Sequence, residues 1–462
     1  MINDKFHDEC GIMGAYLSSN KLNCSSYLYY GLYALQHRGQ ESAGISVNKE
    51  GKIQSHKDVG LVSDVFKGDV LKQLKGNIGI GHVRYSTSGE DGVTNAQPLT
   101  VNHSSGQIAL AHNGNLINDG ALRNMLEDSG VVFQTTIDTE VMVNILARGL
   151  RHGMIEAIQR MVEILKGAYA VVINVGDKLV GIRDPFGLRP LCLGKRDDDY
   201  FLASESCALD AIGAELVRDI EPGEIIVIDD NGLTSYGQNN WVKKKACIFE
   251  QIYFARPDSI MDETSVYAAR HKAGRILAKE SPVDADIVIG VPDSGVPAAI
   301  GYAEASGIPY GVGLIKNKYI GRTFIQPNQQ LREEGVRIKL NPLRDTIEGK
   351  RVVIIDDSIV RGTTSKRLVS ILRQAGAKEV HFRVTSPPVS HTCHFGIDTP
   401  RRKYLIGAKK SVEEIRQILE SDTLAYISLE GLTESVDGRT TFCRACFDGE
   451  YPMEVPVLKS NE

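Results

Sequence analysis

Short apolar runs separated by polar turns dominate the first half of the chain. These runs are rich in Val, Ile, Ala and Tyr and are broken by Gly, Asn and Asp, which is typical of β-strands. Helical periodicity occurs at Ser25–Leu35 and at Thr139–Leu165, where Gly149 and Gly153 interrupt it. Because the strands cluster and do not alternate with helices, this half predicts a layered α+β unit. The predicted strands are Ile78–Tyr85, Ile108–His112, Ala170–Val175, Lys178–Asp184 and Glu224–Asp229.

The pattern changes after about residue 237. Apolar strands now alternate with amphipathic helices, which predicts a doubly wound parallel α/β sheet. The polar stretch Asp229–Lys245 is the best candidate for the junction, although a long hairpin loop would look similar. We therefore expect one domain at residues 10–236 and a second at 237–462. The predicted elements are strands Asp286–Val291, Arg351–Ile355 and Val380–Thr385 and helices Gly295–Ala305 and Thr363–Ala375.

Composition narrows the class of protein. The 462 residues carry a net charge of −5, so nothing points to nucleic acid or to an acidic membrane surface as a partner. No apolar run is long enough to span a membrane, and the first residues lack the apolar core of a secretory signal. We expect a cytoplasmic protein, whose eight cysteines would then be thiols and not disulfides.

The sharpest motif is VVIIDDSIVRGTTS at residues 352–365. An apolar strand ends at Asp356 and Asp357, at the edge where open α/β sheets bind ligands. The turn that follows contains Arg361, Gly362, Thr363 and Thr364 and opens a helix, whose backbone N–H groups can hold a phosphate. The two carboxylates suit ribose hydroxyls or Mg²⁺. A strand followed by ordinary capping residues is the alternative interpretation of a bare Asp-Asp pair.

The full motif resembles the signature of type I phosphoribosyltransferases, which bind phosphoribosyl diphosphate (PRPP). In that family a turn like Pro292–Gly295 holds the pyrophosphate, although alone it could be any strand-to-helix turn, and Ser294 would help Asp356 and Asp357 to place Mg²⁺. The basic segment 316–327 looks like the lid of such enzymes, with Lys316 and Arg322 on PRPP, although a solvated loop is the default for it alone. The PRPP residues implied by the resemblance are Asp293, Ser294, Gly295, Lys316, Arg322, Asp356, Asp357, Arg361, Gly362, Thr363 and Thr364.

A second set of motifs lies in the first half. Cys10 precedes an apolar strand, and LQHRGQESAG, GHVRYST and AHNGNL follow at residues 35–44, 81–87 and 111–116, before Asp138 opens a helix. Each motif alone is weak. Together, in this order, they resemble class II glutamine amidotransferases, which have the N-terminal-nucleophile fold, a four-layer αββα sandwich.

That resemblance implies that Cys10 is the nucleophile and that its own α-amine is the base. A free α-amine has a pKa of about 7.7–8.0 and is partly neutral in the cell, whereas an amide nitrogen cannot accept the thiol proton. The nine residues before Cys10 are therefore expected to be a propeptide that is removed. The alternative is an ordinary N-terminal tail that precedes a cysteine with only a structural role.

The remaining glutaminase roles also come from the resemblance. Arg84 would bind the α-carboxylate of glutamine and Asp138 its α-ammonium group. The side chain of Asn113 and the backbone N–H of Gly114 would form the oxyanion hole. Arg38 and Thr87 would shape the pocket.

Four cysteines are candidates for a metal site. Cys443 and Cys446 form a C-x₂-C pair, and Cys247 and Cys393 could complete a tetrahedral set for zinc or for an iron–sulfur cluster. Spacing alone does not choose between them, and a buried pair without metal is also compatible. Cys24, Cys192 and Cys207 match no motif and are expected to be core residues.

Both motif sets in one chain resemble the glutamine phosphoribosylpyrophosphate amidotransferase family. Cys247, Cys393, Cys443 and Cys446 match the branch that carries a propeptide and a [4Fe–4S] cluster. The resemblance implies that ammonia released from glutamine attacks C1 of PRPP to give 5-phosphoribosylamine, pyrophosphate and glutamate, the first step of purine synthesis. It further implies Mg²⁺, feedback by purine nucleotides and a homo-oligomer, by resemblance a tetramer.

Two rival functions remain open at the level of sequence. The second half could act on a nucleobase beside an inactive glutaminase half, which coupled turnover of glutamine and PRPP would reject. The chain could instead be a PRPP-sensing regulator without catalysis, but a sensor has no use for Cys10, Asn113 and Arg84 together.

Overall fold

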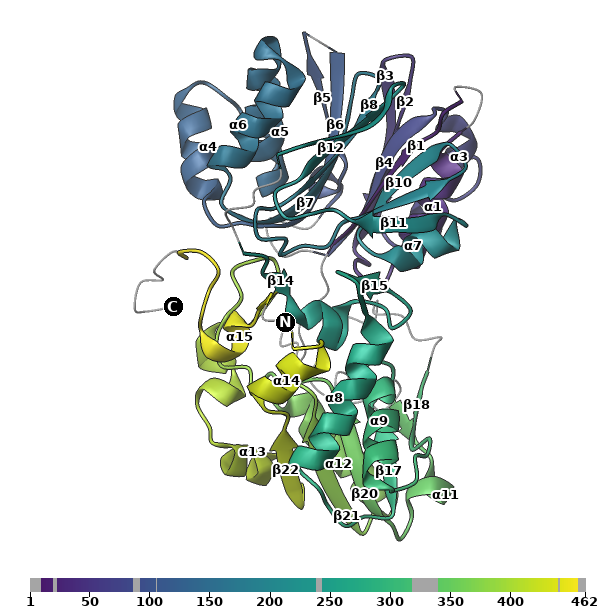
Figure 1. Ribbon diagram of the computed structural model, residues 1–462, viewed down its shortest axis with the longest axis vertical. Helices are drawn as coiled ribbons and strands as arrows, with labels where there is room; N and C mark the ends of the chain where they lie inside the picture. Colours follow the sequence, from purple (N-terminus) through teal and green to yellow (C-terminus); the bar gives the residue numbers. More distant parts are fainter. Residues whose placement is uncertain are drawn as a thin grey trace.

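The computed structural model describes residues 10–19, 23–85, 92–104, 106–237, 243–317, 340–438 and 441–455. Figure 1 shows two lobes joined near β14 (Ala246–Cys247), one built from the first half of the chain and the other from the second half. No helix within these ranges combines the length and the apolar character needed to cross a bilayer.

The first lobe contains two antiparallel sheets that face each other. Residues of both sheets, among them Ile12, Ile80, Ala109 and Val172, form one buried cluster between them. One sheet has the order β11 (Glu215–Asp219), β9 (Cys192–Arg196), β10 (Asp199–Ala203), β1 (Gly11–Tyr16), β4 (Ile78–Arg84), β2 (Ser42–Lys49), β3 (Lys52–Val59). The other has the order β13 (Gly232–Tyr236), β12 (Ile225–Asp229), β8 (Lys178–Arg183), β7 (Gly167–Val175), β6 (Gly106–Leu116), β5 (Leu99–His103).

Helices cover the outer face of each sheet. Leu28 and Leu32 of α1 (Ser25–Ala34) and Leu209 of α7 (Ser206–Ala211) pack on the β1-containing sheet. Three helices pack on the β6-containing sheet: α4 (Asp119–Asp128), α5 (Asp138–Gly149) and α6 (Met154–Ile164). The layers are therefore helix, sheet, sheet, helix, and the predicted αββα sandwich is confirmed.

The second lobe is built on a parallel sheet. Its strand order is β17 (Ile287–Gly290), β20 (Arg351–Asp356), β21 (Glu379–Val384), β22 (Thr423–Tyr426). Alternate residues of β20 point to opposite faces, as strand geometry requires. Val353 and Ile355 pack with α8 (Val266–Glu280) and α9 (Val296–Ser306). Val352 and Ile354 pack with α12 (Thr363–Gln374) and α13 (Val412–Leu419), so the predicted α/β domain is confirmed.

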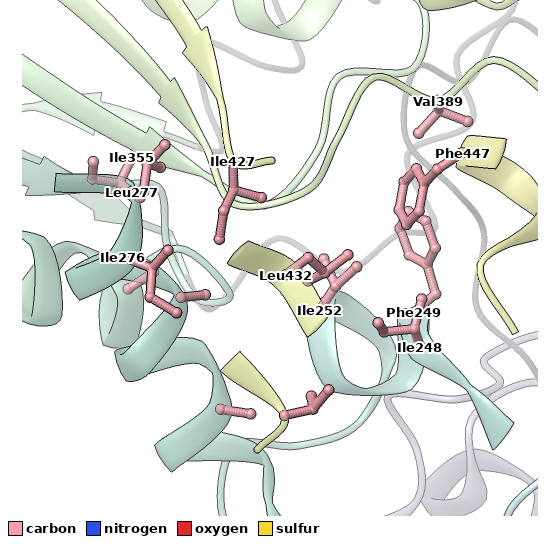
Figure 2. Close-up of a cluster of buried hydrophobic side chains, with 14 of the residues drawn as sticks. Ile248, Phe249, Ile252, Ile276, Leu277, Ile355, Val389, Ile427, Leu432 and Phe447 are labelled. Atoms are coloured by element: carbon pink, nitrogen blue, oxygen red, sulfur yellow. The ribbon is translucent and has the colours of Figure 1, made fainter. Parts of the chain in front are cut away.

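The end of the chain returns to the joint between the lobes. There β23 (Phe442–Cys443) pairs in parallel with β14, which places Cys443 opposite Cys247. Figure 2 shows the apolar cluster beside this joint, where the rings of Phe249 and Phe447 stack with centroids 5.5 Å apart. Phe249 precedes a short π-helix, η3 (Glu250–Phe254), and Phe447 lies in α15 (Ala445–Asp448). The cluster also receives Leu432 from α14 (Leu429–Ser435).

The predicted elements agree with the structure to within a few residues at most ends. Strand β6 extends well beyond the predicted Ile108–His112, because its later, more polar residues pair with β7. The polar stretch Asp229–Lys245 begins as a hairpin, since β12 and β13 pair across Asp229 and Gly232. The apolar strand expected after Cys10 is β1. The sequence pattern missed β2 and β3, where Ser, Lys and other polar residues dilute the apolar signal.

Candidate active sites

Cys10 lies at the start of β1, beside the end of β4. Its thiol donates to the backbone oxygen of Tyr85, 3.5 Å away. Burial raises the pKa of the Cys10 thiol to about 11, although the bond to Tyr85 and the charge of Arg84 oppose the rise. At neutral pH Cys10 is therefore a thiol, and it becomes a nucleophile only if a nearby base removes its proton.

Arg38 lies behind Cys10 and is fully buried. Its Nε donates to the backbone oxygen of Cys10 at 3.2 Å. The same guanidinium forms ion pairs with Glu205 at 2.6 Å and Glu250 at 2.7 Å. Since Glu250 belongs to η3, this network ties the nucleophile's backbone to the second half of the chain. Arg38 thus fixes the backbone at Cys10.

Asn113 and Gly114 lie in β6, in the sheet that faces Cys10's sheet. The side chain of Asn113 is buried, and neither of its polar atoms has a hydrogen-bond partner among the described residues. Buried amides are nearly always paired, so an unpaired one marks a place for a ligand group. Gly114 has φ +143°, a conformation that favours glycine, and a Cβ there would lie 2.0 Å from the backbone oxygen of Ala168.

Asp138 and Arg84 each already have a partner within the protein. Arg84 pairs with Glu41 at 3.0 Å. One oxygen of Asp138 accepts from the backbone N–H of Leu116 at 2.9 Å, and the other lies 3.3 Å from Nδ1 of His112. Burial alone would raise the pKa of Asp138, but His112 and the backbone N–H groups outweigh it and lower the pKa overall.

The charges of these residues reach the nucleophile. Arg84 lowers the pKa of Cys10, while Glu41 and Asp138 raise it. The fold thus brings Cys10, Arg84 and Asp138 within electrostatic range of one another, although they lie far apart in sequence. His82 of β4 also joins the two sheets here, because its Nε2 donates to the backbone oxygen of His112 at 3.1 Å.

Asp356 and Asp357 lie at the carboxyl end of β20, as predicted, and both are buried. Asp357 accepts hydrogen bonds from the hydroxyls of Ser294 at 2.5 Å and Ser358 at 2.6 Å. The bond to Ser294 brings the two predicted PRPP loops into contact. The result is a group of oxygen donors at the edge of the parallel sheet, where such folds bind ligands.

Two helices begin at this edge. Gly295 precedes α9, and a Cβ on it would lie 2.5 Å from the backbone oxygen of Ile355, so the pyrophosphate turn packs tightly against the end of β20. Gly362 precedes α12 with φ +86°, a conformation that favours glycine, and no side chain caps the start of this helix at Thr363 and Thr364. Arg361 lies over the ring of Tyr404, 5.4 Å from its centroid.

Only the first two residues of the predicted lid, Lys316 and Asn317, are described. Lys316 ends β18 (Leu314–Lys316) and forms an ion pair with Asp293 of the predicted pyrophosphate turn. Residues 318–327 of the lid, with Arg322, and Thr87 lie outside the described residues.

The four candidate metal ligands share one cavity. Cys247, Cys393, Cys443 and Cys446 all line a space of about 20 Å³ together with Phe249, Ile397 and Tyr451. Burial raises the pKa of Cys247 and of Cys443 to about 12; Glu250 and the neighbouring thiols add to the rise for Cys247, and the thiol of Cys393 adds to it for Cys443. Yet no group of three or more His, Cys, Asp or Glu side chains within the described ranges has the geometry of a metal site.

Sequence reasoning missed the residues that support the glutaminase site. Glu205 and Glu250 pair with Arg38, and His112 contacts Asp138. A weak signal existed for Glu250, a lone charge in the apolar segment IFEQIYF. Nothing local marks Glu205 as a partner of a residue so distant in sequence.

Comparison with known proteins defines the class. A glutamine amidotransferase domain model matches residues 82–211, and a phosphoribosyl transferase domain model matches residues 259–387. A glutamine amidotransferase unit is thus joined to a phosphoribosyltransferase unit, as the two sites suggest.

Relatives that span the whole chain identify the family. The chain is 49% identical to the amidophosphoribosyltransferase of Synechocystis over 98% of its length and 92% of the relative. It is 50% identical to that of Archaeoglobus fulgidus, covering 97% and 98% of the two chains. It belongs to the amidophosphoribosyltransferase family.

Solved structures agree. The glutamine PRPP amidotransferase of Bacillus subtilis, complexed with ADP and GMP, has a TM-score of 0.91 and 48% identity over 97% of this chain and 98% of that one. A structure described as the allosteric regulatory enzyme of purine biosynthesis has a TM-score of 0.92 at 48% identity, covering 97% of each chain.

Proposed function

We infer that this protein is an amidophosphoribosyltransferase, a pentosyltransferase of purine biosynthesis. It hydrolyses glutamine in the first lobe and transfers the ammonia to C1 of PRPP in the second, giving 5-phosphoribosylamine, pyrophosphate and glutamate. The observation that carries this conclusion is the near-half identity to curated amidophosphoribosyltransferases over almost the whole chain. A nucleobase transferase or a PRPP sensor would not need the half-buried cysteine and the unpaired amide of the first lobe.

We propose the following roles in glutamine hydrolysis. The thiolate of Cys10 attacks the side-chain carbonyl, forms a thioester and releases ammonia; water then hydrolyses the thioester to glutamate. The negative oxygen in each step is stabilised by the side-chain N–H of Asn113 and the backbone N–H of Gly114. The buried, unpaired amide of Asn113 supports this assignment.

Arg84 and Asp138 would hold the two ends of the substrate amino acid. Arg84 must exchange its partner Glu41 for the α-carboxylate of glutamine. The lowered pKa of Asp138 keeps it ionised for the α-ammonium group. Arg38 would keep the backbone of Cys10 in place, and Thr87 would line the pocket.

In the second lobe, Asp356 and Asp357 would bind the ribose hydroxyls of PRPP. The α12 turn, with Arg361, Gly362, Thr363 and Thr364, would hold the 5-phosphate on backbone N–H groups. Asp293, Ser294 and Gly295 would hold the pyrophosphate, and Lys316 and Arg322 would close over it. Ammonia attacks C1 as the bond to pyrophosphate breaks.

Mg²⁺ fits the oxygen donors of this edge. Ser294, Asp356 and Asp357 offer the hard ligands that Mg²⁺ prefers, and the ion would neutralise charge on the departing pyrophosphate. Their contacts with one another support a shared site.

We propose that Cys247, Cys393, Cys443 and Cys446 bind a [4Fe–4S] cluster. Four thiols from three distant segments around one cavity are the donor set of such a cluster. The metal would replace the protons that burial retains on Cys247, Cys443 and Cys446.

We also propose that residues 1–9 are a propeptide and that the domains divide into 10–236 and 237–462. Cleavage before Cys10 would create the α-amine that the buried thiol needs. Feedback by purine nucleotides is supported by the relative that was solved in complex with ADP and GMP, whereas a tetrameric assembly follows from the family resemblance alone. Inhibition assays with ADP and GMP and a light-scattering mass would test these last two points.

A reciprocal pair of variants tests the function. Cys10→Ala removes the nucleophile, so glutamine-dependent synthesis of phosphoribosylamine should fall by about 10³-fold or more while ammonia-dependent synthesis persists. Asp357→Asn should lower synthesis from either nitrogen source by about 10²-fold while basal glutamine hydrolysis persists. Both rates are measured with saturating PRPP and Mg²⁺. Loss of both activities in folded Cys10→Ala would contradict two separate sites.

A further inference from the structure

A loop of the second lobe lies directly against the end of β6. The side-chain amide of Asn115 donates to the backbone oxygen of His394 at 3.1 Å. Beside this bond, a Cβ on Gly396 would lie 3.2 Å from both Cα and the carbonyl carbon of Gly114. The backbone of the proposed oxyanion donor therefore packs on backbone from the other half of the chain.

Gly114 is confined on a second side as well. A Cβ on it would lie 2.0 Å from the backbone oxygen of Ala168, in the neighbouring strand β7. Ala168 also packs against Phe395, the residue next to Gly396. Gly114 thus has Ala168 on one side and Gly396 on another, and little freedom to shift between them.

The loop that carries Gly396 is itself held firmly. The side chain of Phe395 is 2% exposed, and its backbone oxygen accepts a hydrogen bond from Nε of Arg189 at 2.9 Å. The backbone N–H of Cys393 donates to the hydroxyl of Thr399 at 2.8 Å and closes the loop. Gly396 has φ +103°, so this path favours a residue without a side chain.

We propose that Gly396 is a positioning residue for glutamine hydrolysis. An oxyanion hole accelerates a reaction because its donors are fixed before charge develops, and small displacements of such groups are costly. By packing on Gly114, Gly396 fixes the peptide whose N–H would face the oxyanion. The phosphoribosyltransferase lobe thereby supplies part of the glutaminase site. This inference rests on the oxyanion role proposed above for Asn113 and Gly114.

Gly396→Ala in the full-length enzyme tests the proposal. The added methyl group must displace Gly114, so kcat for glutamine hydrolysis should fall about tenfold to a hundredfold, with KM for glutamine within about twofold of the original. Ammonia-dependent synthesis should be unchanged. Gly106→Ala is the matched control: Gly106 lies in the same strand with φ +119°, and no described atom lies within 4 Å of its Cβ position. It should behave like the parent enzyme.

A second measurement distinguishes a positioning role of Gly396 at the oxyanion hole from a general loosening of the glutamine site. An analogue of glutamine with an aldehyde in place of the amide forms a tetrahedral adduct with Cys10 and requires the oxyanion hole, whereas glutamate does not. Gly396→Ala should weaken the affinity for the aldehyde about tenfold and leave the affinity for glutamate unchanged. Equal affinities for the aldehyde in parent and variant would overturn the proposal.

Two further variants keep the outcome interpretable. Asn113→Ala tests the oxyanion assignment alone: if its kcat is normal, the proposed role of β6 fails, and if it is low while Gly396→Ala is normal, only the inference about Gly396 fails. If Gly396→Ala also loses ammonia-dependent synthesis, Asn115→Ala decides. That variant removes the hydrogen bond to His394 together with a local bond to the backbone oxygen of Leu116, and it adds no atom beside Gly114. It should lower kcat about threefold to tenfold; an unchanged kcat would contradict the proposal.

Discussion

At the scale of single residues, burial determines what Cys10 needs in order to react. Its surroundings hold the pKa of the thiol near 11, and its recorded hydrogen bond is to a backbone oxygen, which cannot act as a base. His82, on the neighbouring strand β4, cannot serve as that base. Burial lowers its pKa to about 3, and its Nε2 donates to the backbone oxygen of His112. A free α-amine on Cys10 would meet the need.

The N-terminus of active enzyme provides the corresponding test. Intact mass should show Cys10 as the first residue, and glutamine hydrolysis should rise with pH through about 7.7–8.0 as the α-amine becomes neutral. A gene that encodes Met followed directly by Cys10 should give active enzyme once the initiator is removed. Full glutaminase turnover by protein that retains residues 1–9 would contradict the proposed base.

The sequence also had clear limits at this scale. Asp356, Asp357 and Gly362 could be placed because the whole PRPP loop is one contiguous segment with a characteristic order of strand, acids and turn. The partners of Arg38 could not, because Glu205 and Glu250 reach it only after distant strands have been assembled. Motifs identify residues that act within one segment, while supporting contacts depend on tertiary structure.

At the scale of elements, strands were predictable wherever apolar content was high. The sheet of the second lobe is buried on both faces by helices, and its strands therefore read as continuous apolar runs. Strand β3 was not predicted, because it is largely exposed and carries Lys, Gln and Asp. Its neighbour β2 was not predicted either. The short pair β14 and β23 is equally hidden in sequence, yet it brings Cys247 opposite Cys443.

We expect a metal bound beside this pair of strands to hold distant segments of the chain together. Cys446→Ser should lose bound iron and inorganic sulfide together and unfold at a lower temperature, because the four ligands connect distant segments. The control is Cys24→Ala, which changes a buried cysteine of the first lobe. This variant should retain the iron and sulfide content of the parent enzyme. The measurements are iron and sulfide content after anaerobic purification. Stoichiometric zinc without sulfide would contradict the cluster.

At the scale of the whole molecule, the fold of each lobe was predictable from the sequence, but the contacts between the two lobes were not. Alternating or clustered strands reveal the type of sheet within a domain. They carry no information on which surfaces of two domains meet. The contact of Gly396 with Gly114 and the ion pair of Arg38 with Glu250 exist only in the assembled chain, and both place glutaminase groups against the other lobe.

The central claim is that the two lobes form one enzyme, in which ammonia from glutamine is used on PRPP. It is tested most directly by measuring glutamate, pyrophosphate and phosphoribosylamine in the same reaction, with and without PRPP and Mg²⁺. With both present, we predict equal amounts of the three products and faster release of glutamate than without them. Glutamate formed by the parent enzyme without an equal amount of phosphoribosylamine when PRPP and Mg²⁺ are present, or PRPP consumed without glutamine or ammonia, would contradict the account.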